Sequence, residues 1–142
     1  MRHEEIREGV RALCAQFPGE YFRRVDHERA YPEAFVEALT RAGWLAALIP
    51  TEYGGSGLGL GEASVILEEI NRCGGNAGAC HGQMYNMGTL LRHGSPAQKE
   101  RYLPGIAAGE LRLQSMAVTE PSAGISAASQ PARVSASTNS CG

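Results

Sequence analysis

The 142-residue chain carries 13 Lys and Arg against 15 Asp and Glu, a net charge of −2, with 43% apolar and 20% charged residues. This composition is typical of a globular domain, and the absence of any block of like charge argues against a nucleic-acid-binding protein. No apolar run approaches the ~20 residues of a membrane-spanning helix, so neither nucleic acid nor a membrane is an expected partner.

The cysteines and the start of the chain bear on the cellular compartment. Cys14, Cys73, Cys80 and Cys141 show no paired C-x-x-C spacing, and the first ten residues lack the apolar stretch of a secretory signal. Cys73, Cys80 and His81 lie close together in the sequence, but their spacing fits no common zinc site, so no metal site is predicted. Free thiols without a signal favour a reducing compartment, and we expect a cytoplasmic protein.

Two helices are predicted in the first 43 residues. Apolar residues recur at helical spacing from Ile6 to Phe17 and predict a helix over 4–16. The polar stretch that follows shows no clear pattern. Pro32 then marks the start of a second helix, which Gly43 ends, and the apolar run 44–50 is expected to turn inward.

Five glycines between positions 54 and 61 predict a loop. A phosphate-binding loop is disfavoured, because neither a Gly-Lys-Ser/Thr sequence nor a G-x-G-x-x-G sequence after a strand is present.

Three more helices follow. One lies around 63–70, and a second begins near a cap at Asn76 and is rich in small residues. A third opens with Ser95 as its cap and Gln98 three positions later, a capping box; Pro104 ends its first part, and GIAAGE adds a turn. The expected buried residues include Trp44, Ile66, Ile70, Met84 and Leu91.

The spacing of apolar residues stops being helical only at 111–118, LRLQSMAV, and this segment predicts a β-strand. A lone strand leaves its edges unpaired, so it pairs with another chain or belongs to a sheet that is not complete here. The loop TEPSAG follows. Thr119 offers a hydroxyl and Gly124 permits close backbone approach, which together suit a flat heterocycle or a phosphate.

No catalytic residue is predicted within the chain. His81 lies near an apolar helix stripe and is interpreted as a core or interface residue. Glu68 and Glu69 are adjacent on a helix and face different directions, so they are not interpreted as a carboxylate pair. No nucleophile with a neighbouring base is recognisable.

Three segments, taken together, resemble the N-terminal part of the acyl-CoA dehydrogenase family: GWLAALIPTEYGGSGLGLGE, HGSPAQKERYLPGIAAGEL and MAVTEPSAG. The similarity covers residues 1–124. It implies a helical N-terminal domain, a middle β-domain and a C-terminal helical bundle, with FAD between the latter two. It also implies a homo-oligomer that oxidises an acyl-CoA thioester, in which a carboxylate takes the α-proton and the flavin takes the β-hydride.

The resemblance further implies a cofactor site at Met116, Ala117, Val118, Thr119 and Gly124. The stretch 116–119 would lie against the flavin ring, with the Val118 backbone and the Thr119 hydroxyl as partners. Gly124 would lie where flavin and acyl-CoA meet. The catalytic base would be supplied from outside this chain.

The chain departs from the family pattern after Gly124, where Ile125-Ser126 replaces the expected Ser-Asp. We therefore expect a helical domain over 1–110, the first strand and flavin loop of an incomplete β-domain over 111–124, and an irregular tail over 125–142 that a truncation or a shift of reading frame would explain. Such a chain is expected to be inactive alone.

Two alternatives remain at this stage. One is a non-catalytic helical module that pairs with partner chains through its exposed strand. The other is an acyl-CoA oxidase or flavin monooxygenase with the same N-terminal architecture.

Overall fold

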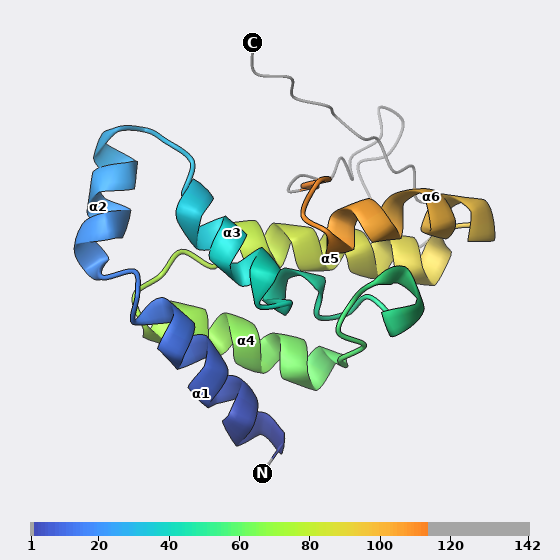
Figure 1. Ribbon diagram of the computed structural model, residues 1–142, viewed down its shortest axis with the longest axis horizontal. Helices are drawn as coiled ribbons and strands as arrows, with labels where there is room; N and C mark the ends of the chain where they lie inside the picture. Colours follow the sequence, from blue (N-terminus) through green and yellow to red (C-terminus); the bar gives the residue numbers. More distant parts are fainter. Residues whose placement is uncertain (1, 114–142) are drawn as a thin grey trace, which may run out of the picture.

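The structure, a computed structural model, describes residues 2–113, and these form six α-helices and two short 3-10 helices (Figure 1). In chain order the elements are α1 (Arg2–Cys14), α2 (Gly19–His27), α3 (Glu33–Arg41), η1 (Trp44–Ala46), η2 (Thr51–Tyr53), α4 (Leu60–Arg72), α5 (Gly78–His93) and α6 (Pro96–Ala107). No residue between 2 and 113 belongs to a β-strand, so the mainly α-helical fold class is confirmed. Most of the predicted strand 111–118, the loop to Gly124 and the tail 125–142 lie outside the described residues.

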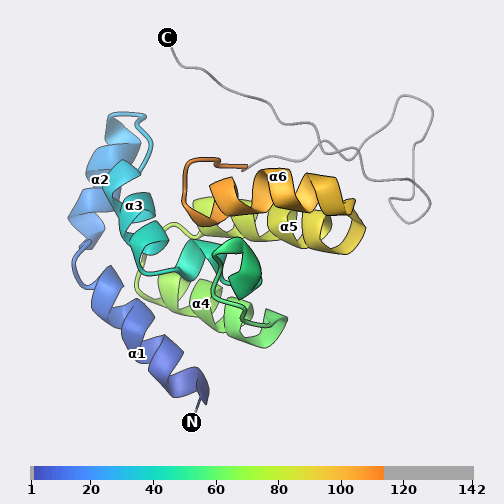
Figure 2. The same ribbon diagram turned by 45° about the vertical axis from the view of Figure 1, so that its right-hand side comes forward.

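Two helix pairs build the molecule. α1 lies beside α4, and α5 lies beside α6, while η1 contacts α3, α5 and α6 (Figures 1 and 2). The first pair and α3 enclose one apolar cluster, which includes Ile6, Val10, Leu13, Phe35, Leu39, Ile66 and Ile70. The second pair encloses another, made of Ala46, Ile49, Met87, Leu90, Leu103, Ile106 and Leu113. The run 44–50 supplies residues to both clusters, so its predicted inward course is confirmed.

Local signals in the sequence set several helix ends. Gly43 follows the last turn of α3 with φ 78°, a left-handed conformation that favours glycine. Ser95 Oγ accepts a hydrogen bond from the Gln98 N–H, and Gln98 Oε1 accepts one from the Ser95 N–H, which is the predicted capping box of α6. Asn76 Oδ1 accepts a hydrogen bond from the Gly78 N–H, but the residue at the cap position of α5 is Ala77, one position after the predicted cap.

The helices depart from the sequence analysis in two places: one prediction is wrong and one helix was missed. Pro104 lies inside α6 and does not end it, because Leu103 and Ile106 on either side of it are buried and hold the helix against α5. The polar stretch after position 18 contains the unpredicted helix α2, none of whose residues is fully buried. Its Tyr21 and Phe22 rings stack edge to face on Phe17 and Phe35, at centroid distances of 5.1–5.3 Å. This aromatic cluster holds α2 in place.

The predicted core is confirmed in part. Ile66, Ile70 and Met84 are buried, whereas Trp44 and Leu91 are only half-buried. The Trp44 ring covers Gly9 at the edge of the first cluster, with its Cζ2 atom 3.0 Å from the place a β-carbon on Gly9 would take. The tryptophan therefore closes the cluster at its rim and does not fill its centre.

Replacement of Ile70 by alanine is expected to lower the free energy of unfolding by about 2–5 kcal/mol, because it leaves a cavity in a fully buried site. Urea unfolding followed by circular dichroism measures the loss. Leu60→Ala is the matched control, since that side chain lies 71% exposed on the same helix and its truncation should cost little. Equal effects of the two substitutions would show that α4 does not face the core through Ile70.

Candidate functional site

The predicted flavin-contacting residues, 116–119 and Gly124, lie outside the described residues, but the segment that leads to them is described. This segment, Leu111 to Leu113, runs along α5 after the end of α6. Two buried side chains of α5, Gln83 and Asn86, contact its backbone. The candidate site is therefore approached through a contact between a helix and the start of the predicted strand.

Gln83 and Asn86 form what we call the amide clamp. Gln83 Nε2 donates to the Leu111 carbonyl at 3.0 Å, and the Leu113 N–H donates to Gln83 Oε1 at 2.9 Å. Asn86 Nδ2 donates to the Leu113 carbonyl at 2.9 Å and also to the Gly82 carbonyl at 2.8 Å. A carboxamide can donate and accept at once, so Gln83 makes the pair of bonds that a neighbouring β-strand would make.

Burial makes the amide clamp specific. Gln83 is 1% exposed and Asn86 is 7% exposed, and an amide buried without a partner is costly. The Leu111 N–H also donates to the Gly105 carbonyl at 3.0 Å, and the Leu113 side chain belongs to the second apolar cluster. Another course of the chain at 111–113 would cost Gln83 both of these hydrogen bonds and leave Asn86 Nδ2 only its bond to the Gly82 carbonyl.

Sequence reasoning missed the amide clamp, although a signal was present. Gln83 and Asn86 lie three positions apart on α5, among its buried residues Met84 and Met87. Polar side chains at this spacing on a buried helix point to a polar target for both. The identity of the target could not be inferred, because it lies 27 to 30 positions further along the chain.

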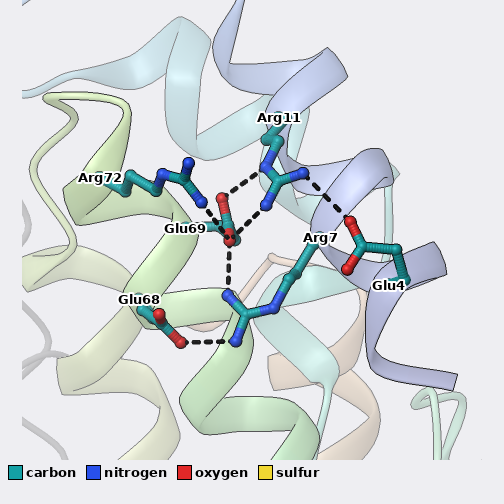
Figure 3. A network of polar contacts seen from close by, with 6 residues as sticks. All are labelled: Glu4, Arg7, Arg11, Glu68, Glu69 and Arg72. Atoms are coloured by element: carbon teal, nitrogen blue, oxygen red, sulfur yellow. Dashed lines mark hydrogen bonds and ion pairs between the residues drawn. The ribbon is translucent and has the colours of Figure 1, made fainter. Parts of the chain in front are cut away.

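A second polar group, centred on Glu69, joins α1 to α4 (Figure 3). The Glu69 side chain is 0% exposed and receives two hydrogen bonds from Arg11, at 2.8 and 3.0 Å, and one from Arg7. Arg7 also reaches Glu68, which is 58% exposed. The two glutamates do face different directions, as predicted. Burial of Glu69 among arginines was not foreseen, although Glu69 falls on the same helix stripe as Ile66 and Ile70.

This environment keeps Glu69 ionised. Hydrogen bonds from Arg11 and then Arg7 lower the pKa of the Glu69 carboxyl to about 2, against the opposing effect of burial. Hydrogen bonds to Glu68 and then Glu69 raise the pKa of the Arg7 guanidinium, and the bond to Glu69 raises that of Arg11. A carboxylate with so low a pKa is a weak proton acceptor at neutral pH, so its role is to hold two helices together and not to act as a base.

The other features of the described residues that could form a binding or catalytic site do not form one. His81 is exposed and packs edge to face on Tyr85 at 5.3 Å, so the core alternative is wrong, and its placement at an interface stays a prediction. Residues 2–113 contain no group of three His, Cys, Asp or Glu side chains placed to bind a metal. No helix in this range is long and apolar enough to cross a membrane. A depression of about 230 Å³ between α3 and the end of α6 is smaller than the ~300–1,000 Å³ usual for ligand sites.

Glu69→Gln is expected to change how stability depends on pH. The folded pKa of about 2 lies below the ordinary value of 4.5, so the carboxylate stabilises the fold above pH 4.5 and loses this contribution as the pH falls toward 2. Wild type should exceed the variant in unfolding free energy at pH 7, and the difference should shrink between pH 4.5 and 2. Urea titrations across this range measure it, with the exposed Glu68→Gln as control. A difference that stays constant down to pH 2 would contradict the argument.

Gln83→Leu is expected to release the segment 111–113. Without its acceptor, the Leu113 amide should exchange its hydrogen about two- to tenfold faster, the range that corresponds to one net hydrogen bond. Hydrogen exchange read residue by residue tests this. Gln16→Leu, the same substitution at an exposed position, should leave the Leu113 rate unchanged. Unaltered protection of Leu113 in the Gln83 variant would mean that the amide clamp does not hold the segment.

Comparison of the sequence with known proteins points to one family. The family model for the acyl-CoA dehydrogenase N-terminal domain matches residues 1–110. The chain is 41% identical over 92 residues to isovaleryl-CoA dehydrogenase, mitochondrial, of Pongo abelii, an alignment that covers 63% of this chain and 22% of that protein. It is 35% identical over 136 residues to the probable acyl-CoA dehydrogenase FadE25 of Mycobacterium tuberculosis, which covers 94% of this chain and 34% of the relative.

A third relative has a different named substrate. The chain is 32% identical over 120 residues to cyclohex-1-ene-1-carbonyl-CoA dehydrogenase of Syntrophus aciditrophicus, across 84% of this chain and 29% of that protein. The chain thus spans about a third or less of the length of each of these relatives. The match of the family model over residues 1–110 agrees with the first two of the three segments that carry the resemblance in the sequence, and the third segment lies beyond the match. The chain therefore belongs to the acyl-CoA dehydrogenase family.

Proposed function

We propose that this chain forms the N-terminal helical domain of an FAD-dependent acyl-CoA dehydrogenase, an oxidoreductase that introduces an α,β double bond into an acyl-CoA thioester. The family match over 1–110 supports the proposal, as do three relatives named as acyl-CoA dehydrogenases, two of them with a specific acyl-CoA in the name. The amide clamp is the structural observation that carries it. It gives the segment leading to the flavin residues a defined starting point on the helical domain.

The distance along the chain makes this positioning effective. Met116 follows Leu113 by three residues, which span at most about 10 Å when extended. A displacement of the segment 111–113 would therefore also displace the stretch 116–119, because so short a connection cannot absorb the shift. The helical domain would in this way help to place the Val118 backbone and the Thr119 hydroxyl against the flavin ring, and Gly124 beside the acyl-CoA.

FAD would supply the redox chemistry when bound, as the acceptor of the substrate hydride. This chain would supply orientation through Met116, Ala117, Val118, Thr119 and Gly124. The carboxylate that takes the α-proton, the second wall of the flavin site and the rest of the β-domain would come from residues outside this chain. Assembly into a homo-oligomer and a cytoplasmic location complete the proposal.

The predicted break after Gly124 stays a prediction. The alignment with FadE25 covers 94% of this chain and so runs past Gly124. The genomic DNA downstream of codon 124, read in all three frames, tests whether a Gly-Ser-Asp continuation is encoded.

The 142-residue chain alone is expected not to oxidise acyl-CoA. A chain that contacts only one face of the flavin ring and supplies no base cannot bind FAD tightly or support turnover. The assay mixes the chain with FAD, an acyl-CoA and an electron-accepting dye. Bleaching of the dye above the protein-free control would contradict the proposal that this chain is only one part of the catalytic unit. Formation of hydrogen peroxide without bleaching would favour an acyl-CoA oxidase.

A complementary experiment uses a chimera in which residues 1–124 of this chain are joined to the part of FadE25 that follows the matching loop. This chimera is expected to bind FAD, show flavin absorbance and reduce the dye with acyl-CoA. Thr119→Val in the chimera should weaken FAD binding by about two- to tenfold, because it removes one hydroxyl and keeps the shape. A folded chimera without flavin would contradict the proposal, and a Thr119 variant with unchanged affinity would remove that residue from the site.

A further inference from the structure

The ends of α1 and α4 bring two cysteines together. The two helices run in the same direction, since His3 Nε2 lies 3.9 Å from Glu62 Oε1 near their starts and Arg11 binds Glu69 near their ends. Both helices rise by about 1.5 Å per residue. The positions three beyond Arg11 and four beyond Glu69 therefore lie at about the same level along the two helices, and they are Cys14, the last residue of α1, and Cys73, which caps α4.

The surroundings of the two thiols agree with this placement. Burial is the main cause that raises the pKa of Cys14 to about 12, and the neighbouring Cys73 thiol and Glu69 carboxylate add to the rise. Cys14 is 6% exposed, whereas Cys73 is exposed to solvent, and both are free. Cys80 differs, because its pKa is raised by burial alone, with no second thiol contributing.

We propose that Cys14 and Cys73 form a cross-linking site that a small-molecule disulfide such as oxidised glutathione converts to an intramolecular disulfide. The exposed Cys73 loses its proton to solvent, and its thiolate attacks one glutathione sulfur. The glutathione S–S bond breaks and one glutathione thiolate leaves. Cys14 then loses its proton and attacks the Cys73 sulfur, which releases the second glutathione. Two protein thiols and one glutathione disulfide thus become one protein disulfide and two reduced glutathiones.

The order of the two steps follows from exposure and thiol chemistry. The thiolate is the attacking form, and Cys73 is the one of the pair that solvent reaches. The high pKa of Cys14 makes its own attack the slower step. The mixed disulfide on Cys73 therefore forms first and is consumed as the cross-link closes.

The cross-link would reinforce the junction that Glu69 already holds. It would tie α1 to α4 just beyond the arginine–glutamate network, and it would join residues far apart in the sequence. A covalent link across a long loop restricts the unfolded chain and so favours the folded one. In a reducing compartment the thiols stay free, and the cross-link forms only when the oxidised glutathione fraction rises.

Intact mass spectrometry of the 142-residue chain incubated with oxidised glutathione tests the proposal. The expected product has two hydrogens fewer than the reduced chain, and digestion should yield a peptide pair joined through Cys14 and Cys73. The midpoint of thermal unfolding should rise by roughly 5–15 °C, and dithiothreitol should reverse both changes. The test involves no flavin or acyl-CoA, so its outcome is independent of the proposed function.

Substitutions make the result decisive. Cys80→Ala should retain the cross-link, whereas Cys73→Ser and Cys14→Ala should each abolish it, with Cys14→Ala retaining a glutathione adduct on Cys73. Three outcomes would overturn the proposal: a wild-type chain that ends as the stable glutathione adduct, a disulfide that involves Cys80 or Cys141, and a chain that does not react.

Discussion

The ionised carboxylate of Glu69 is the constraint on which the arrangement of the helices depends. It is completely buried, and a buried charge is tolerated only when it is paired and hydrogen-bonded. Its hydrogen-bonded partners Arg7 and Arg11 come from α1, so a rotation or shift of α1 against α4 would leave the buried carboxylate with only the more distant Arg72, at 3.7 Å. This requirement selects one rotation and one register of α1, where the apolar stripe alone would allow neighbouring ones.

The register that Glu69 selects is passed on through the rest of the molecule. With α1 in place, Ile66 and Ile70 on α4 are covered and the first apolar cluster is closed, with α3 and the start of α5 on its other side. α5 then runs from the first cluster into the second, where Met87 and Leu90 pack with residues of α6. The orientation of α5 decides where Gln83 and Asn86 point, and hence where the chain lies at 111–113.

Through the amide clamp, a helix makes the hydrogen bonds to an extended segment that a neighbouring strand makes in a sheet. Side-chain amides replace backbone groups and hold the extended chain at Leu111 and Leu113. Such bonds are directional and, when buried, are costly to leave unmade, so they set position more strictly than apolar contact does. In the function proposed above, the helical domain would contribute to catalysis in this way, by defining where the cofactor-binding segment begins.

The sequence by itself determined the helical class, the family and those helix ends that depend on neighbouring residues, such as Gly43 after α3 and the Ser95–Gln98 box of α6. These features are local, because a cap or a glycine turn satisfies backbone groups within a few residues. Only the tertiary structure decided the pairing of Glu69 with α1, the target of Gln83 and Asn86, and the existence of α2. Each of these depends on contacts between residues that are distant in the chain, such as the 58 and 62 positions that separate Glu69 from Arg11 and Arg7. Periodicity along one helix shows that a polar side chain is buried, but its partner is set by how the helices pack.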